Sequence, residues 1–258
     1  MKKKFSVLAL TGLLALWFST AQAIPTLQLG SYAPSGSGQG TYVDYTTNGS
    51  DEDTAFITTG YKLLAAGTYQ NNPEYRIGGQ YTGGKDWTDT AFGLQSEFAG
   101  RGAIVMATVA DGSRNDGSVS VKLGNLDPFL KLDTFALFPN SHYPVNQTRD
   151  FFFFDIGNFA KNANATTDFA NESGSGDGEV KEFAVTIVGL DSVHFDLMAL
   201  VTDKNGSKIR TTWEVNSNSK DVTWEDGGNP VPEPASMLLM GTGLAALAGA
   251  RARRRKSA

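Results

Sequence analysis

Ser118-Val119-Ser120-Val121-Lys122-Leu123 is the stretch that decides the fold class. Apolar and polar residues alternate along it, so in an extended chain its three apolar residues share one face. Turn-forming pairs flank the stretch, with Asp116-Gly117 before it and Gly124-Asn125 after it. Alternation bounded by turns predicts a short strand with one buried face.

Further strand candidates lie on both sides of this stretch. They cover residues 27–29, 54–64, 103–110, 183–190, 193–201 and 209–215. Asn205-Gly206 predicts a hairpin between the last two, since this pair readily adopts the positive φ of tight turns. Residues 31–40 and 161–179 are rich in Gly, Ser and Asn, which predicts loops. Short strands between turns predict an all-β fold, a single jelly-roll-like β-sandwich over residues 24–229.

Composition limits the function classes. The chain has 258 residues, no cysteine and a formal net charge of -5. This length can bury a sizeable core, which excludes a small disulfide-stapled scaffold, and the lack of cysteine excludes a thiolate metal site or nucleophile. The acidic balance argues against a nucleic-acid partner, which requires basic surface to neutralise phosphates.

Residues 1–23 predict a secretory signal peptide. Lys2-Lys3-Lys4 form the basic start, an apolar run follows over residues 5–18, and Ala21 and Ala23 supply the small residues that signal peptidase requires. Export through the Sec translocon and cleavage after Ala23 are therefore expected. An uncleaved membrane anchor is the alternative, but the apolar run is shorter than the roughly 20 residues that span a bilayer.

Residues 230–258 predict a second targeting segment. It opens with the box Pro232-Glu233-Pro234, whose prolines end any preceding element. The uncharged residues 235–250 predict a transmembrane helix, and residues 251–258 form a basic tail. Basic residues after an apolar segment hold that end in the cytoplasm, opposite the exported body. These residues are Arg251, Arg253, Arg254, Arg255 and Lys256.

The order of proline box, apolar segment and basic tail resembles the PEP-CTERM sorting signal of Gram-negative bacteria. The resemblance implies transient anchoring in the inner membrane and cleavage by exosortase, a membrane-embedded cysteine transpeptidase. It also implies delivery of the body to the cell surface or to the matrix of a bacterium that makes exopolysaccharide. Pro232, Glu233 and Pro234 would then be recognition elements for that enzyme. A plain C-terminal membrane anchor is the alternative, whereas the Leu-Pro-x-Thr-Gly box of sortase substrates is absent.

Parts of the body resemble the choice-of-anchor N family of bacterial surface proteins. Met198 stands where that family has an aromatic residue. The resemblance implies an exported β-rich module with an interchangeable C-terminal anchor, and it brings no catalytic residues. The stretches that carry it are Pro25-Thr-Leu-Gln-Leu29, Leu137-Phe-Pro-Asn-Ser-His142-Tyr-Pro, Phe151-Phe-Phe-Phe154-Asp155-Ile-Gly157 and Gly189-Leu-Asp-Ser-Val-His194-Phe-Asp196-Leu197.

The two histidines, His142 and His194, are the first candidates for chemistry. His194 and Asp196 share a face if they lie in a strand, and such a pair can orient an imidazole for metal binding or base chemistry. We favour the alternative of an ordinary pair at a strand surface or edge, with the neighbouring apolar residues facing the core. No Gly-x-Ser-x-Gly motif is present, so no catalytic residue and no metal ligand is assigned.

Calcium and glycans are weaker candidate ligands. Residues 111–117 superficially resemble an EF-hand loop, but Asp116 and Lys122 stand where Gly and Glu are required, so a polar turn is favoured. Residues 51–53 offer carboxylates to calcium, although a solvated acidic loop is favoured. Exposed aromatic residues would bind sugars, although core packing is favoured for them. They are Trp87, Trp213, Trp224, Tyr69, Tyr75 and Tyr81.

The charge of the body differs from that of the whole chain. Without the two targeting segments, residues 24–229 retain 14 basic and 26 acidic residues, a net charge of -12. Such a body stays soluble and repels anionic polymers unless divalent cations bridge them. The sequence thus predicts a non-enzymatic surface or matrix protein, associated with exopolysaccharide. A carbohydrate-binding module and a glycan hydrolase with an unassigned carboxylate pair are the alternatives.

Overall fold

A computed structural model describes residues 24–32, 42–48, 52–69, 76–78, 98, 100–135, 149–205, 208–216 and 220–226. This part of the chain is built from strands, with a short 3-10 helix at Ser113–Asn115. The prediction of an all-β body is therefore confirmed. The strands are β1 Leu27–Tyr32, β2 Tyr45–Asn48, β3 Glu52–Ile57, β4 Lys62–Tyr69, β5 Arg76–Ile77, β6 Ala103–Ala110, β7 Ser120–Leu123, β8 Leu130–Leu132, β9 Arg149–Gly157, β10 Asn162–Asp168, β11 Ser173–Val188, β12 Ser192–Asn205, β13 Lys208–Val215 and β14 Asp221–Glu225.

The predicted signal peptide, residues 1–23, and the predicted transmembrane helix, residues 235–250, lie outside the described residues. Within the described residues, no helix has the length and apolar character needed to cross a membrane.

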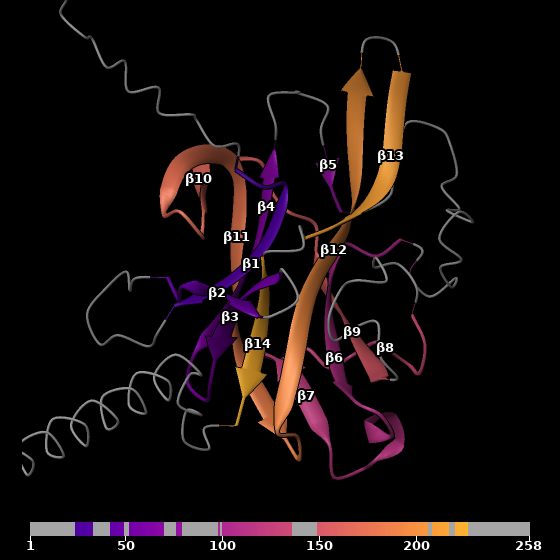
Figure 1. Ribbon diagram of the computed structural model, residues 1–258. Helices are drawn as coiled ribbons and strands as arrows, with labels where there is room; N and C mark the ends of the chain where they lie inside the picture. The colour runs from indigo at the N-terminus through magenta and orange to yellow at the C-terminus, as the bar shows by residue number, and fades with distance from the viewer. Residues whose placement is uncertain are drawn as a thin grey trace, which may run out of the picture.

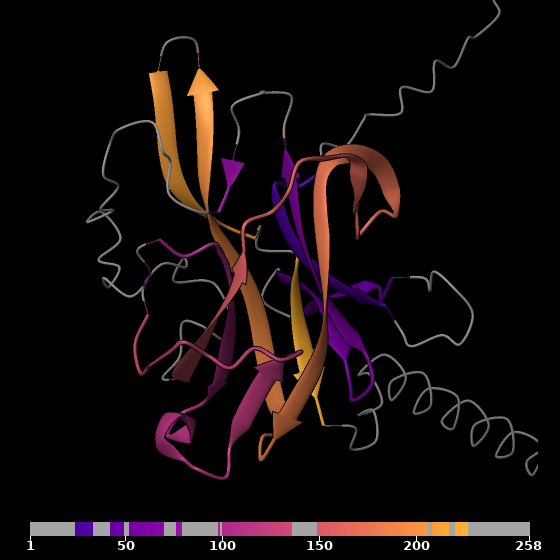
Figure 2. The same ribbon diagram turned by 180° about the vertical axis from the view of Figure 1, so that it is seen from behind.

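The described strands form two sheets (Figures 1 and 2). The smaller sheet has the order β1-β4-β11-β10, with β7 also paired to β11. The larger sheet has the order β2-β3-β14-β12-β6-β9-β8, with β13 and β5 also paired to β12. Neighbouring described strands run antiparallel except for β3 and β14, which are parallel. Strand β12 therefore has a partner on each side and occupies the middle of the larger sheet.

One hydrophobic core lies between the two sheets. Alternate residues of strands from both sheets enter it, because successive side chains of a strand point to opposite faces. The face of the larger sheet that points away from this core is called its outer face below. Residues of the core include Leu27, Leu29, Leu63 and Ala65 from the smaller sheet, and Val105, Phe152, Phe154, Val193, Phe195, Leu197, Val222 and Trp224 from the larger sheet.

Part of the outer face of the larger sheet, over β6, β9 and β12, is also buried. Phe151 and Phe153 lie on it, and Phe153 packs edge-to-face against Phe98 with ring centroids 5.0 Å apart. Met198 of β12 and Met106 of β6 belong to the same outer cluster. Because both faces are covered, β6 and β9 are continuous apolar runs, as expected for strands without a solvated face.

Two sequence-based strand predictions are confirmed in detail. Val121 and Leu123 are buried while Lys122 between them is exposed, as the alternating stretch predicted. Strand β7 begins at Ser120, two residues later than predicted. Strands β12 and β13 form the predicted hairpin, with Asn205 paired to Lys208. This hairpin extends beyond the rest of the larger sheet in both views (Figures 1 and 2).

Two other predictions are wrong. Residues 54–64 are not one strand, because β3 ends at Ile57 and β4 begins at Lys62 after a turn with Gly60 at φ 94. Residues 161–179 are not a loop, because they form β10 and the first part of β11. Their glycines allow close strand contact rather than disorder: a Cβ on Gly178 would lie 2.1 Å from the Gly67 carbonyl oxygen. Of the other predicted loop, residues 31–32 end β1 and the rest lies outside the described residues.

Candidate functional site

His194 and Asp196 lie on the outer face of β12, pointing away from the core that Val193, Phe195 and Leu197 enter. The prediction that the two polar residues share a face is confirmed by an ion-pair contact of 3.3 Å between His194 Nε2 and Asp196 Oδ2. The favoured interpretation as a surface or edge pair is wrong. His194 is 4% exposed and Asp196 is fully buried, because β12 is flanked by β14 and β6 and its outer face is covered.

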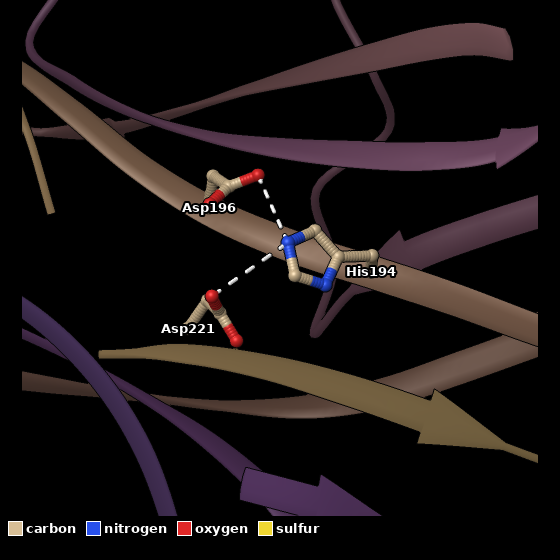
Figure 3. Close-up of side chains that lie close together, drawn as sticks. All are labelled: His194, Asp196 and Asp221. Carbon is tan, nitrogen blue, oxygen red and sulfur yellow. Dashed lines mark ion pairs between the residues drawn. The ribbon is translucent and has the colours of Figure 1, made fainter. Parts of the chain in front are cut away.

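Asp221, the first residue of β14, joins this pair. In the antiparallel pairing of β14 with β12, Thr223 lies opposite His194 and Val222 lies opposite Phe195. Continuing this register by one residue places Asp221 beside Asp196. His194 Nε2 lies 3.9 Å from Asp221 Oδ2, and Asp221 is fully buried (Figure 3). Sequence reasoning missed Asp221 because no strand was predicted there. The alternation in Asp221-Val222-Thr223-Trp224 is the pattern that could have revealed it.

Two polar side chains fix the orientation of the cluster. Thr223 Oγ1 lies 2.9 Å from His194 Nδ1, so the other ring nitrogen, Nε2, faces the two carboxylates (Figure 3). Asn216, also fully buried, accepts a 2.7 Å hydrogen bond from the Leu197 N–H. Its amide nitrogen lies 3.4 Å from Asp196 Oδ1. The cluster is therefore held by strand pairing and by side-chain hydrogen bonds.

A separate buried ion pair lies next to the cluster in sequence. The Lys220 ammonium contacts Asp168 Oδ1 at the end of β10. Burial alone would raise the pKa of Asp168, but hydrogen bonds from Lys220, Asn171 and the Ala170 N–H hold it below its ordinary value. Burial raises the pKa of Tyr45, and the charges of Asp221 and Asp168 raise it further. Asp168, which pairs with a lysine, is thus one of four buried carboxylates among the described residues, beside Asp150, Asp196 and Asp221.

The cluster can hold a cation. One ring nitrogen and one oxygen from each carboxylate lie within 4.8 Å of one another, and among the described residues this is the group with metal-binding potential. Catalysis by the same residues would require substrate to reach them, and all three are buried. The arrangement therefore favours ion binding over acid–base chemistry on an external substrate.

The aromatic candidates do not assemble into an exposed platform within the described residues. Trp224 is 4% exposed and belongs to the core between the sheets, so the favoured prediction of core packing is confirmed for it. The Tyr69 hydroxyl donates a 2.7 Å hydrogen bond to the Phe159 carbonyl, and its ring packs against the same core. Trp213 lies in β13. Trp87, Tyr75 and Tyr81 lie outside the described residues.

The two candidate calcium-binding segments, residues 111–117 and 51–53, have different outcomes. Residues 111–117 form the predicted polar turn, in which the Asp116 carboxylate accepts hydrogen bonds from the Ser118 hydroxyl and N–H at 2.6 and 2.8 Å. These bonds lower the pKa of Asp116. The predicted acidic loop is wrong for Glu52 and Asp53, because they begin β3, where backbone pairing with β2 outweighs their low strand propensity. Residue 51 and His142 lie outside the described residues.

The targeting residues also lie outside the described residues. They are Ala21 and Ala23 of the predicted cleavage site, the box Pro232-Glu233-Pro234, and the basic residues Arg251, Arg253, Arg254, Arg255 and Lys256.

Comparison with known families matches residues 230–255 to the PEP-CTERM protein-sorting motif. The resemblance of the C-terminal segment to this sorting signal is thereby confirmed, and the motif marks the chain as a candidate for export and exosortase processing. No curated protein and no solved structure matches the chain. The resemblance of the body to the choice-of-anchor N family stays a prediction.

Proposed function

We propose that the chain is an exported protein of a Gram-negative bacterium whose body is delivered to the cell surface or extracellular matrix by exosortase. The motif at residues 230–255 is the observation that carries this proposal. The chain passes the Sec translocon and loses residues 1–23 to signal peptidase. Residues 235–250 hold it in the inner membrane until exosortase cleaves near Pro232-Glu233-Pro234.

The position of the last described strand supports such processing. Strand β14 ends at Glu225, and the Asp226 N–H donates a 2.9 Å hydrogen bond to the Asp191 carbonyl. The sorting motif begins at residue 230, after this last contact. Cleavage at the proline box therefore removes no described strand, and the core between the sheets would remain complete.

We further propose that the body, residues 24–229, is a non-enzymatic module of jelly-roll-like architecture and choice-of-anchor N type. With its net charge of -12, the body would associate with anionic exopolysaccharide only through bridging divalent cations. Direct binding of sugar by exposed aromatic residues is less favoured, because Trp224 is in the core.

Fractionation of the native host tests the sorting proposal. The full chain, with an epitope tag in the body, is followed in a strain with exosortase and in a strain that lacks it. We expect a shortened body at the surface or in the medium of the first strain and a full-length chain in the inner membrane of the second. Replacing Pro232, Glu233 and Pro234 together by Ala should reproduce the second result, whereas Ser257→Ala serves as the matched control.

A full-length chain in the inner membrane despite exosortase would refute the sorting proposal and establish the plain anchor instead. The polymer proposal has its own test. The released body should sediment with exopolysaccharide of the same host in calcium, and EDTA should release it. Sedimentation that is unchanged by EDTA would favour direct sugar binding, and its absence in both conditions would refute polymer association.

A further inference from the structure

We propose that His194, Asp196 and Asp221 bind one divalent transition-metal ion of the zinc class inside the body. The ligands would be His194 Nε2 and one carboxylate oxygen from each aspartate (Figure 3). This inference concerns the interior of the β-rich body and is independent of how the chain is sorted.

Charge is the first argument. Asp196 and Asp221 are fully buried, so an ion between them would be held by two carboxylates out of contact with bulk water. With a neutral imidazole the three residues carry a net charge of -2, and with an imidazolium they still carry -1. A divalent ion bound to a neutral imidazole and two carboxylates gives a net charge of zero.

Distance is the second argument. Two ligands of a tetrahedral zinc ion, each about 2.1 Å from the metal, are separated by about 3.4 Å. His194 Nε2 and Asp196 Oδ2 lie 3.3 Å apart, close to this spacing. His194 Nε2 and Asp221 Oδ2 lie 3.9 Å apart, so a small rotation of the Asp221 carboxylate closes the site. The spacings between the three ligand atoms thus match those expected around a small metal ion.

The donor atoms select the class of metal. Calcium prefers six to eight oxygen ligands, whereas this site offers a ring nitrogen and few oxygens. Imidazole together with carboxylates suits zinc and its first-row neighbours. We therefore expect zinc, manganese or cobalt to bind in preference to calcium or magnesium.

The surroundings of His194 are those of a ligand. Metal-binding histidines use their second ring nitrogen for a hydrogen bond that fixes the ring. Thr223 Oγ1, 2.9 Å from Nδ1, supplies this contact from the strand that also carries Asp221. The ion would link β12 to β14, the last described strand, in a protein without disulfides. Because the ligands are buried, the ion has a structural role, and its binding energy adds to folding stability.

The metal content of the purified full-length chain, held in detergent, is the primary test. We expect about one zinc-class ion per chain by elemental mass spectrometry, loss of the ion after prolonged chelation, and a lower melting temperature of the chelated protein. Zinc or manganese should restore the melting temperature, whereas magnesium and calcium should not. A chain without bound metal, whose melting temperature no divalent ion changes, would overturn the proposal.

The Asp221→Asn variant provides a second, independent test of the metal site. Zinc should no longer raise the melting temperature of this variant, because one of the three ligand groups is gone. A zinc-induced rise in melting temperature as large in Asp221→Asn as in the wild type would count against the proposal.

Asp150→Asn is the matched control, because Asp150 is also buried and accepts a 2.6 Å hydrogen bond from the Arg114 N–H. It should lower stability and leave the zinc response intact. Thr223→Val keeps all three ligands, so zinc affinity should fall about 10- to 100-fold without being lost. An unchanged zinc affinity in Thr223→Val would count against the argument that Thr223 holds the His194 ring for metal binding.

Discussion

Lys220 and Asp168 form an ion pair that is buried where the two sheets approach each other. Lys220 immediately precedes β14 of the larger sheet, and Asp168 ends β10 of the smaller sheet. The Lys220 carbonyl also accepts a 3.0 Å hydrogen bond from the Leu29 N–H of β1. Lys220 is 7% exposed and Asp168 is 3% exposed, so water screens the pair poorly.

Removal of the lysine charge should therefore be costly. Lys220→Met leaves the Asp168 carboxylate buried without its cation, which costs about 3–5 kcal/mol in unfolding free energy. Urea denaturation of the two proteins measures the difference. Lys122→Met is the control, because Lys122 pairs with Asp127 at 3.0 Å on the surface and should cost at most about 1 kcal/mol. Equal losses in both variants would contradict the burial of the Lys220 pair.

The low pKa of Asp168 predicts a pH dependence. A carboxyl whose folded-state pKa lies below its unfolded value stabilises the fold above the unfolded value, and this contribution is lost as the pH falls through the folded value. The stability difference between wild type and Asp168→Asn should therefore shrink from pH 6 to pH 3. Thermal unfolding across this range measures it. A difference that grows with acidity would contradict the direction of the shift.

Gly178 should tolerate no side chain. A Cβ there would lie 2.1 Å from the Gly67 carbonyl oxygen, a backbone atom that cannot rotate away. Gly178→Ala should destabilise the protein by about 1–3 kcal/mol, the usual range for overpacking. Gly117→Ala is the matched control, because nothing lies within 4 Å of its added Cβ. Chemical denaturation compares the two, and a neutral Gly178→Ala would show that β4 and β11 lie further apart.

Phe153 and Phe154 test whether both faces of the larger sheet are buried. The two are fully buried, Phe153 in the outer cluster and Phe154 in the core between the sheets. Each replacement by Ala should cost about 3–5 kcal/mol. A strand with one solvated face would instead give one large and one negligible loss. Urea unfolding curves distinguish the two outcomes.

Export predicts a defined new N-terminus. Signal peptidase should cut after Ala23, so N-terminal sequencing of the exported protein should begin at Ile24. Ala23→Phe places a large residue at the cleavage position and should leave the precursor uncut, which its mass reports. Gln22→Asn, between the two small residues, is the control and should be processed normally. Unchanged processing of Ala23→Phe would relocate the cleavage site.

Local patterns predicted much of this molecule. Alternation over residues 118–123 identified β7 and its buried face, and Asn205-Gly206 identified the hairpin of β12 and β13. The same reasoning failed over residues 161–179, because glycine-rich composition marks both mobile loops and closely packed strands. A glycine-rich composition shows that side chains are missing from a segment. Only the arrangement of neighbouring strands shows whether another strand packs into the space that this leaves.

The candidate site was likewise predicted only in part from the sequence. The spacing of His194 and Asp196 placed both on one face of a strand, because side chains alternate along any extended chain. Neither their burial nor Asp221 followed from that spacing. By itself, the sequence determined the all-β class, the hairpin and the sorting motif, each of which is written in adjacent residues. Only the tertiary structure decided which faces are covered and that β14 lies beside β12, because strand pairing between distant segments leaves no periodic trace in either segment.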